Sequence, residues 1–301
     1  MINKNKIVND LINLGIKKGD LLNVKVSLKS IGNVEGGAKT VIEALLEVVG
    51  ENGGIISDSF IKAFPISKLK NKENPDYISR PNSSSYAGAI ANAMVNHPKS
   101  FRSPHPIQKF VGIGVKTKEI VLKHDINSFP YGVLLDMTKL NGKNLRIGDE
   151  SKVVGVGTTH VAICLLGYKQ NRRKLGVNYI DKINNNVKNF IISWAGGCDE
   201  GFNNLLSFYR NNNAFISEGT VGKSQAILSD MKKTLDLELE LARSNPHFFM
   251  CDNPSCYKCR LTWEHSDNNL IKTIWYNVKH FNKKNLMAIG YFMLHKNYLP
   301  K

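Results

Sequence analysis

The chain has 301 residues, of which 42% are hydrophobic, and a formal net charge of +16 from 41 basic and 25 acidic side chains. This composition is enough for one large core, with or without an appendage. No run of about 18 apolar residues occurs and no apolar segment follows the first six residues, so we expect neither a membrane span nor a signal peptide, and a cytoplasmic protein.

The positive charge favours polyanionic partners, which include nucleic acid, anionic lipid and phosphate-rich cofactors. The lysines are spread along a chain that is also rich in Asn and Ile. Nucleic acid is therefore an unlikely partner. Five cysteines, an odd number without an export signal, indicate reduced thiols.

The first fifty residues predict a helix, a strand and a second helix. Apolar residues recur at helical spacing over 3–15 and again over 38–49, and Leu21 and Leu22 begin a strand between them. Two serines, a lysine and three glycines fill the connection 27–37. Glycines let the backbone approach a ligand closely, and the start of a helix attracts anions. The connection is a candidate phosphate site, although it lacks known phosphate-loop spacings, and a strand-to-helix turn without a ligand is the alternative.

The next elements alternate between extended and irregular segments. Residues 53–60 predict a second strand, and the proline- and lysine-rich segment 61–85 predicts a long loop that either covers a substrate cleft or is a solvated excursion. A helix is expected over 86–94, with Ser85 as its candidate cap. Prolines flank His105, so that segment is extended, and a buried strand follows over 110–115.

Beyond residue 150 the alternation continues. A strand is expected over 152–156, a helix over 158–168 after a glycine turn, a hairpin over 177–194 and a late helix over 225–243. Alternating strands and helices, with some antiparallel pairing toward the middle, predict an α/β fold with a mixed central sheet flanked by helices.

Several blocks in this order resemble the aminoglycoside 3-N-acetyltransferase family, also called antibiotic N-acetyltransferases. The blocks are Gly15–Asp20, Val26–Gly32, Val34–Ala38, the set Arg102, Ser103, His105, Pro106, Phe110 and Gly114, then Phe129–Gly132 and Gly219–Ala226. The resemblance is scattered over about residues 14–243. It departs from the family at Lys109, where a serine is usual, and at Leu135 and Asp136, where Ser-Pro is usual.

The resemblance implies that the chain binds acetyl-CoA and acetylates an amino group of an aminoglycoside or amino-sugar. The phosphates of coenzyme A would account for part of the basic excess. The cofactor-binding residues that it implies are Ser27, Leu28, Lys29, Ser30, Gly32, Val34, Gly36 and Gly37, with Ser103 and His105 on a cofactor-side loop. For His105 a structural role is favoured over catalysis, because the flanking prolines make a rigid loop.

The family's catalytic motif, Gly-Val-Gly-x4-Thr-x2-His-x2-Glu, is altered here. When Tyr168 is aligned with the aromatic residue that follows the motif, Cys164 stands at the histidine position and Gly167 at the glutamate position. His160 lies one helical turn before Cys164 and on the same face. Acetyl transfer to an amine needs a base, so His160 is the candidate base. Cys164 either lines the thioester pocket or acts as a nucleophile paired with His160.

Asp199 and Glu200 are the candidate carboxylates, either for the amine or to orient His160. Each of these residues also has an ordinary structural interpretation. His160 could be a helix-start residue that is hydrogen-bonded to the backbone, and Cys164 could be a small buried hydrophobic residue. The two carboxylates could simply be solvated at the surface.

The C-terminal region carries a separate signal, in which His247, Cys251, Cys256 and Cys259 follow a His-x3-Cys-x4-Cys-x2-Cys pattern. This is the ligand set of a structural zinc site, and free thiols or a Cys256–Cys259 redox pair are the alternatives. We therefore expect an acetyltransferase-like domain over 1–243 and a Cys- and aromatic-rich extension over 244–301. Aromatics alternate with lysines over 267–298, for example at Trp275, Lys279 and Phe281, a pattern that could bind acidic or nucleotide-linked sugars or a partner subunit.

Two functions remain open from the sequence. One is an acetyl-CoA-dependent N-acetyltransferase. The other is a non-catalytic binding or scaffold protein on an acetyltransferase fold, with a zinc-stabilised tail that engages nucleic acid or a partner.

Overall fold

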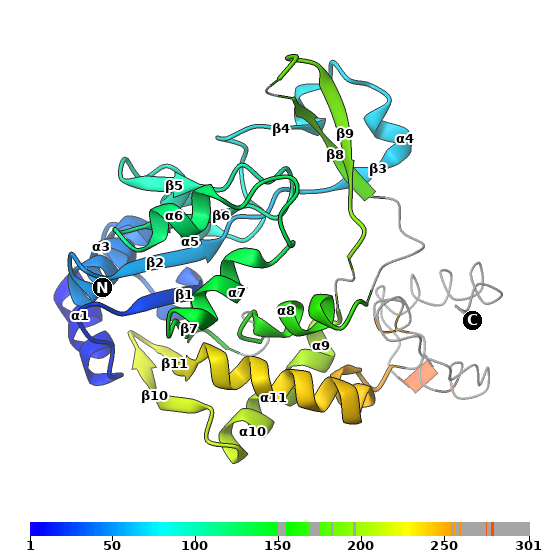
Figure 1. Ribbon diagram of the computed structural model, residues 1–301. Coiled ribbons are helices and arrows are strands. Elements are labelled where there is room, and N and C mark those ends of the chain that lie inside the picture. Colours follow the sequence, from blue (N-terminus) through cyan, green and yellow to red (C-terminus); the bar gives the residue numbers. More distant parts are fainter. Residues whose placement is uncertain are drawn as a thin grey trace.

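A seven-stranded mixed sheet in the order β10-β11-β7-β1-β2-β6-β5 forms the centre of the molecule (Figure 1). The computed structural model describes residues 1–149, 155–168, 175–181, 183–194 and 197–253, together with Cys256, Cys259, Trp275, Val278 and Lys279. The central strands β1 (Leu21–Val26), β2 (Gly54–Asp58) and β7 (Lys143–Ile147) are parallel, with Leu22 opposite both Ile55 and Lys143. The outer strands, all antiparallel to their neighbours, are β5 (Ser100–Arg102), β6 (Phe110–Ile113), β10 (Phe215–Val221) and β11 (Ser224–Asp230).

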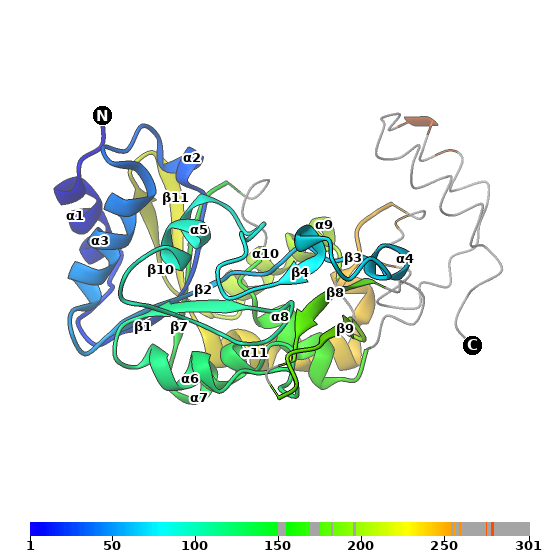
Figure 2. The same ribbon diagram turned by 90° about the horizontal axis from the view of Figure 1, so that it is seen from above.

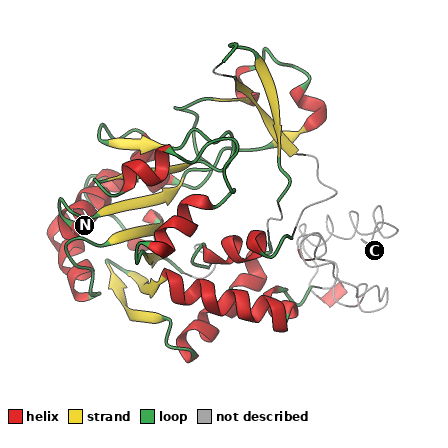
Figure 3. Ribbon diagram, viewed as in Figure 1, coloured by secondary structure: helices red, strands yellow, loops and turns green. Residues whose placement is uncertain are grey.

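Helices cover both faces of this sheet (Figures 2 and 3). On one face α1 (Lys4–Asn13), α3 (Gly37–Val49) and α5 (Ala89–Val95) share a core with Leu22, Val24 and Ile55. On the other face Leu21 and Ile56 contribute to a second core, because successive strand residues point to opposite faces. The helices that cover this second face are α6 (Thr117–Leu122), α7 (Gly132–Lys139), α8 (Thr158–Leu165) and α11 (Met231–Ser244).

The predicted fold class, α/β with a mixed central sheet flanked by helices, is confirmed by this arrangement. The hairpin predicted over 177–194 is also present, as β8 (Leu175–Ile180) and β9 (Val187–Ile191). Among the described residues, no helix has both the length and the apolar character that a bilayer crossing requires.

The segment 61–85 is more ordered than the predicted loop. It contains β3 (Phe64–Pro65), α4 (Ile66–Leu69), a 3-10 turn over Pro75–Tyr77, and β4 (Ile78–Ser79). Both short strands pair with β8 and, with β9 on its other side, build a small second sheet away from the central one (Figure 1). The pairing partner lies about a hundred residues later in the chain, so local composition does not reveal it.

Two predicted helix starts were wrong. Residues 225–230 belong to β11 and not to the late helix, because Gly222 and Lys223 form a two-residue turn that returns the chain against β10 and β7. The helix predicted from residue 86 begins at Ala89, because Gly88 precedes it with a φ of 109°. The strand predicted over 152–156 falls mainly on residues that lie outside the described part of the chain.

Three further elements share a core with the second half of α11. They are α9 (Asp199–Phe202), α10 (Asn204–Asn211) and a 3-10 turn, η2 (Pro246–Phe249). A third core joins Phe202, Leu205 and Tyr209 to Phe249 and Met250. The first residues after α11 therefore pack against α9 and α10, which belong to the main body of the fold.

Candidate active site

The candidate site lies where the parallel strands β1 and β2 end. In sheets of this kind ligands bind beyond the carboxyl ends of the parallel strands. The glycine-bearing connection 27–37 leaves the sheet at the end of β1, and β2 ends at Asp58. Lys25 and Asp58 occupy the strand positions that face α7 and α8, as Leu21 and Ile56 do.

The 27–37 connection is built from a one-turn helix and a glycine pair. Ser27 caps α2 (Leu28–Ile31), and its hydroxyl oxygen accepts hydrogen bonds from the backbone N–H of Ser30 at 3.3 Å and from the Ser30 hydroxyl at 2.9 Å. Gly36 and Gly37 then open α3 with φ values of 71° and 62°. No described side chain caps this helix, and the Gly37 N–H donates to the Val34 carbonyl at 3.1 Å, so the first-turn N–H groups that follow Gly37 are the ones available to an anion.

Lys25 and Asp58 form a shielded ion pair, with 3.6 Å between the Lys25 Nζ and Asp58 Oδ2 atoms. The Asp58 side chain is only 15% exposed. Burial raises the pKa of Asp58 and the charge of Lys25 opposes that rise. Within the described part of the chain, Asp58 Oδ1 has no hydrogen-bond partner. A shielded carboxylate with an unused acceptor is suited to hold a cationic amine.

Tyr131 connects this ion pair to helix α8. Burial raises the pKa of the Tyr131 hydroxyl well above its ordinary value, and the nearby Cys164, Tyr86 and Asp58 raise it further. Trp194 lies close enough to the same hydroxyl to oppose part of this rise in its pKa. The structure therefore brings Cys164, Asp58 and Trp194 around one phenol.

His160 packs against the ring of the same tyrosine. The imidazole stacks on Tyr131 with ring centroids 5.0 Å apart and 7° between the planes, and Phe202 of α9 meets it edge-on at 5.3 Å. His160 and Cys164 thus both lie beside Tyr131, as their spacing on one helix face predicts. Burial raises the pKa of Cys164 to about 12, so this side chain is a thiol at neutral pH. That state favours a lining role over nucleophilic attack.

The predicted carboxylates Asp199 and Glu200 open α9, whose Phe202 touches His160. Glu200 is exposed to solvent. The side chain of Asp199 lies outside the described part of the structure. A role for either carboxylate stays a prediction.

Ser103 and His105 are both buried and held by backbone groups. The Ser103 hydroxyl accepts a hydrogen bond from the Phe110 N–H at 2.9 Å, and His105 Nδ1 accepts from the N–H groups of Ile107 and Gln108 at 3.1 and 2.9 Å. Burial, with smaller contributions from His124 and Lys109, lowers the pKa of His105 to about 3. His105 is thus neutral with its proton on Nε2, which suits the structural role. Cofactor contact by this loop stays a prediction.

Sequence reasoning missed Lys25, Asp58, Tyr131 and Trp194. A usable signal was present for the first two, since each is the one charged residue of a strand and lies in its last two positions. Tyr131 stands in the Phe129–Gly132 block of the family resemblance, but neither it nor Trp194 carried a local signal for the contacts between α7, α8 and the segment after β9.

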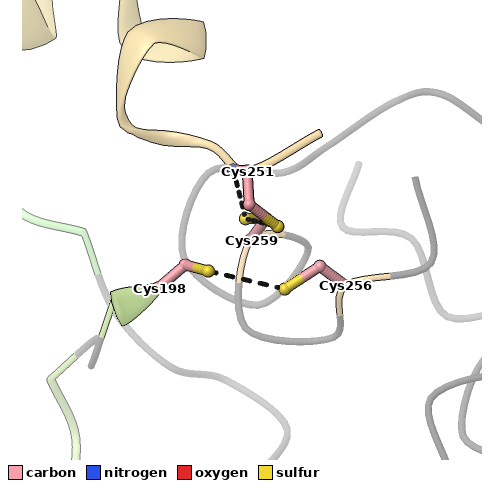
Figure 4. A group of neighbouring side chains, drawn as sticks. All are labelled: Cys198, Cys251, Cys256 and Cys259. Atoms are coloured by element: carbon pink, nitrogen blue, oxygen red, sulfur yellow. Dashed lines mark hydrogen bonds between the residues drawn. The ribbon is translucent and has the colours of Figure 1, made fainter. Parts of the chain in front are cut away.

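A second set of side chains converges at the start of α9 (Figure 4). The Sγ atoms of Cys198, Cys251, Cys256 and Cys259 all lie within 4.8 Å of one another. Three of the four predicted metal ligands are in this set. The fourth position is taken by Cys198, whereas His247 is an exposed residue of η2 that does not join the described cluster.

Known proteins match both the sequence and the fold. The family model described as aminoglycoside 3-N-acetyltransferase matches residues 24–242. An aminoglycoside N(3)-acetyltransferase III from Salmonella sp is 30% identical over 159 residues. That match covers 50% of this chain and 54% of the relative, so the chain spans about half the length of this curated protein.

Two solved structures share the fold. One is a histidine-to-alanine variant of the aminoglycoside acetyltransferase AAC(3)-IVa in complex with a gentamicin, with a TM-score of 0.72, 19% identity, and coverage of 88% of this chain and 97% of that one. The other is AAC-IIIb in binary complex with CoASH, with a TM-score of 0.67, 19% identity, and coverage of 80% and 96%. The fold likeness agrees with the family match, and the chain belongs to the aminoglycoside 3-N-acetyltransferase family.

Proposed function

We propose that this protein transfers the acetyl group of acetyl-CoA to an amino group of an aminoglycoside or amino-sugar. One observation carries the proposal. In a chain of this family, the glycine-bearing 27–37 connection and the side chains of Asp58, Tyr131 and His160 belong to the same end of the central sheet. A phosphate-bearing donor and a cationic acceptor could therefore meet there.

The donor half of the site is the 27–37 connection. The uncapped start of α3 offers backbone N–H groups to the phosphates of coenzyme A, and the hydroxyls of Ser27 and Ser30 belong to the same connection. The net charge of +16 favours association with such a polyanion. A related protein of the same fold has been solved with CoASH, which supports this choice of donor.

The acceptor half of the site is the group around Tyr131. An ammonium group would be drawn to Asp58, whose Oδ1 is unused among the described residues. The amine must lose a proton before or during attack on the thioester, and an imidazole is the side chain best matched to that step. His160, stacked on Tyr131, is the imidazole that we assign to it. A related structure contains a gentamicin, which supports an amino-sugar acceptor.

A non-catalytic binding protein is the second candidate. The observation that favours it is the departure from the family motif, since Cys164 and Gly167 occupy the positions of the family's histidine and glutamate. Such a protein would retain the donor site and lack turnover.

Two measurements separate the candidates. Thermal unfolding is followed over a range of acetyl-CoA concentrations, and release of the coenzyme A thiol is followed with gentamicin, sisomicin and simple amino-sugars as acceptors. The enzyme should show a melting temperature that rises with acetyl-CoA and thiol release that depends on the amine. A rise without amine-dependent thiol release would support the binding protein. No shift at millimolar acetyl-CoA would overturn the proposal.

A further inference from the structure

The four-cysteine cluster is assembled from two separate parts of the chain, the start of α9 and the segment after α11. Cys198 precedes the first turn of α9, Cys251 follows η2, and Cys256 and Cys259 lie further along. All four are free thiols, and Cys198 and Cys259 are almost fully buried, at 2% and 0% exposure. A single buried thiol is ordinary, but four sulfur atoms that converge from distant positions form a set of soft donors that can hold a metal ion.

The distances in the cluster match the spacing of metal ligands. The Sγ atoms of Cys198 and Cys256 are 3.7 Å apart, and those of Cys251 and Cys259 are 3.8 Å apart (Figure 4). A tetrahedral zinc ion with four Zn–S bonds of about 2.3 Å requires S–S separations of about 3.8 Å. Both distances are far too long for a disulfide, which has an S–S bond of about 2.05 Å.

A backbone contact supports the same conclusion. The N–H of Cys251 points at the sulfur of Cys259, with 3.4 Å between the two atoms. A hydrogen bond to a sulfur favours its thiolate form, which is the form that binds a metal. Soft thiolate donors in a closed tetrahedral set select zinc or an iron–sulfur centre over hard cations such as magnesium.

We propose that Cys198, Cys251, Cys256 and Cys259 bind one structural zinc ion. The site has four protein ligands and leaves no position for substrate, so its role is to hold the chain together and not to react. It joins the start of α9 to the segment after α11, which are separated by about fifty residues in the chain.

A zinc ion in this cluster would also fix the position of α9, which contacts both α8 and η2. Phe202 is one turn after Cys198 and packs edge-on against His160. Gly201 lies so close to the Phe249 carbonyl that a side chain there would collide with the backbone of η2. A zinc ion at this point would hold α9 between the tail and helix α8.

The test begins with the metal content of the full-length protein. After purification without chelators and dialysis against metal-free buffer, elemental analysis should find about one zinc per chain. Cys198→Ser and Cys259→Ser should each reduce this to below about 0.1 zinc per chain. His247→Ala and Cys164→Ser are the matched controls, because they remove the other candidate ligand and the fifth thiol, and both should keep the metal.

Spectroscopy of the unmodified chain covers the case in which a serine variant fails to fold. The protein is stripped with a chelator under reducing conditions and titrated with Co²⁺. One equivalent should produce thiolate-to-cobalt charge-transfer bands and the visible bands of tetrahedral Co²⁺, and one equivalent of Zn²⁺ should abolish them.

Three results would overturn the zinc assignment. The first is a folded protein that holds less than about 0.1 zinc per chain while its cluster thiols react at once with a thiol reagent. The second is iron in place of zinc in the purified protein. The third is loss of zinc in His247→Ala with retention in Cys198→Ser, which would restore the ligand set that the sequence spacing predicts.

Discussion

At the scale of single residues, the most informative feature is the neighbourhood of Tyr131. Its ring stacks on His160, and its hydroxyl lies near Cys164 and Asp58. In the alignment that the motif suggests, the partly buried thiol of Cys164 stands where the family carries a histidine, one turn later. If the chain is an enzyme, proton transfer therefore depends on a histidine one turn before the family position.

The proposed base predicts a ranking of two substitutions. His160→Ala should lower kcat by about a hundredfold or more, the usual scale for loss of a general base. Cys164→Ala should lower it much less, because burial raises the pKa of this thiol to about 12 and keeps it protonated. Steady-state thiol release measures both, and His97→Ala, in the loop after α5, is the control for loss of an imidazole. The reverse ranking, with an acetylated Cys164 trapped in mass spectrometry, would indicate a covalent route instead.

The burial of a second residue, Glu238 of α11, predicts that the free energy of unfolding depends on pH. Glu238 is fully buried, and accepts hydrogen bonds from Thr159, at 2.6 Å, and from Tyr209. Burial raises its pKa from 4.5 to about 7, against the effect of these hydrogen bonds. The folded state thus holds the proton more tightly than the unfolded state. Its contribution to stability is complete below about pH 4.5 and is lost as the pH rises through about 7.

Glu238→Gln should remove this loss, because glutamine stays neutral and still offers an oxygen to Thr159 and Tyr209. At pH 8 the variant should be more stable by at most about 3 kcal/mol, the value of the pKa difference. Near pH 4.5 the two proteins should have similar stability. Urea unfolding at both pH values measures the difference. A variant that is less stable at pH 8 would show that the ionised carboxylate is accommodated by its partners.

At the scale of elements, the start of α3 is the feature on which the proposed donor binding depends. Gly37 has a φ of 62°, and a Cβ built there would meet no atom within 4 Å. Gly19 shares both properties, with a φ of 86°, but lies before the amino end of β1. The two positions therefore carry similar backbone strain on substitution and differ in their place relative to the proposed donor site.

Gly37→Val should raise the KM for acetyl-CoA by about tenfold or more, because the side chain would fill the space next to the first-turn N–H groups. Gly19→Val, the matched control, should lower the melting temperature by a similar amount and leave this KM unchanged. Initial rates with varied acetyl-CoA measure the effect. If only the KM for the amine changes, the 27–37 connection belongs to the acceptor half of the site.

At the scale of the whole molecule, the question is where the acetyltransferase-like domain ends. The sequence predicts a boundary between residues 243 and 244. However, Phe249 and Met250 are 0% and 7% exposed and share a core with α9 and α10. The physical contacts of the domain therefore continue past the predicted boundary.

Truncation tests this directly. A chain that ends at residue 243 exposes the apolar surface that Phe249 and Met250 cover, and each buried side chain of this kind contributes about 1.5–3 kcal/mol. Its melting temperature should fall by about 6 °C or more, and it should bind a hydrophobic dye. A chain that ends at residue 259 retains this core and the four cysteines and is the control. Equal stability of the 1–243 chain and the full chain would support the predicted boundary.

Local patterns in the sequence were sufficient for much of the fold. Helical spacing located α1, α3 and α8, apolar runs located β1, β2 and β6, and the blocks around 15–38 and 102–114 identified the family, which the match over 24–242 confirms. The sequence reveals these features because each depends on residues that are close together along the chain. The family motifs are also short segments of the chain, so they too can be recognised without the tertiary structure.

Tertiary structure alone decided the features that join distant segments. Residues 225–230 became a strand because β7 and β10 lie on either side of them. Residues 64–65 and 78–79 became strands of a second sheet because β8 pairs with both. Cys198 joined the tail cysteines from a position 53 residues before Cys251, where no spacing rule could select it over His247. Lys25 and Asp58 met because β1 and β2 are parallel neighbours. Spacing along the chain specifies local conformation, whereas the partners across a fold are specified only once the chain has packed.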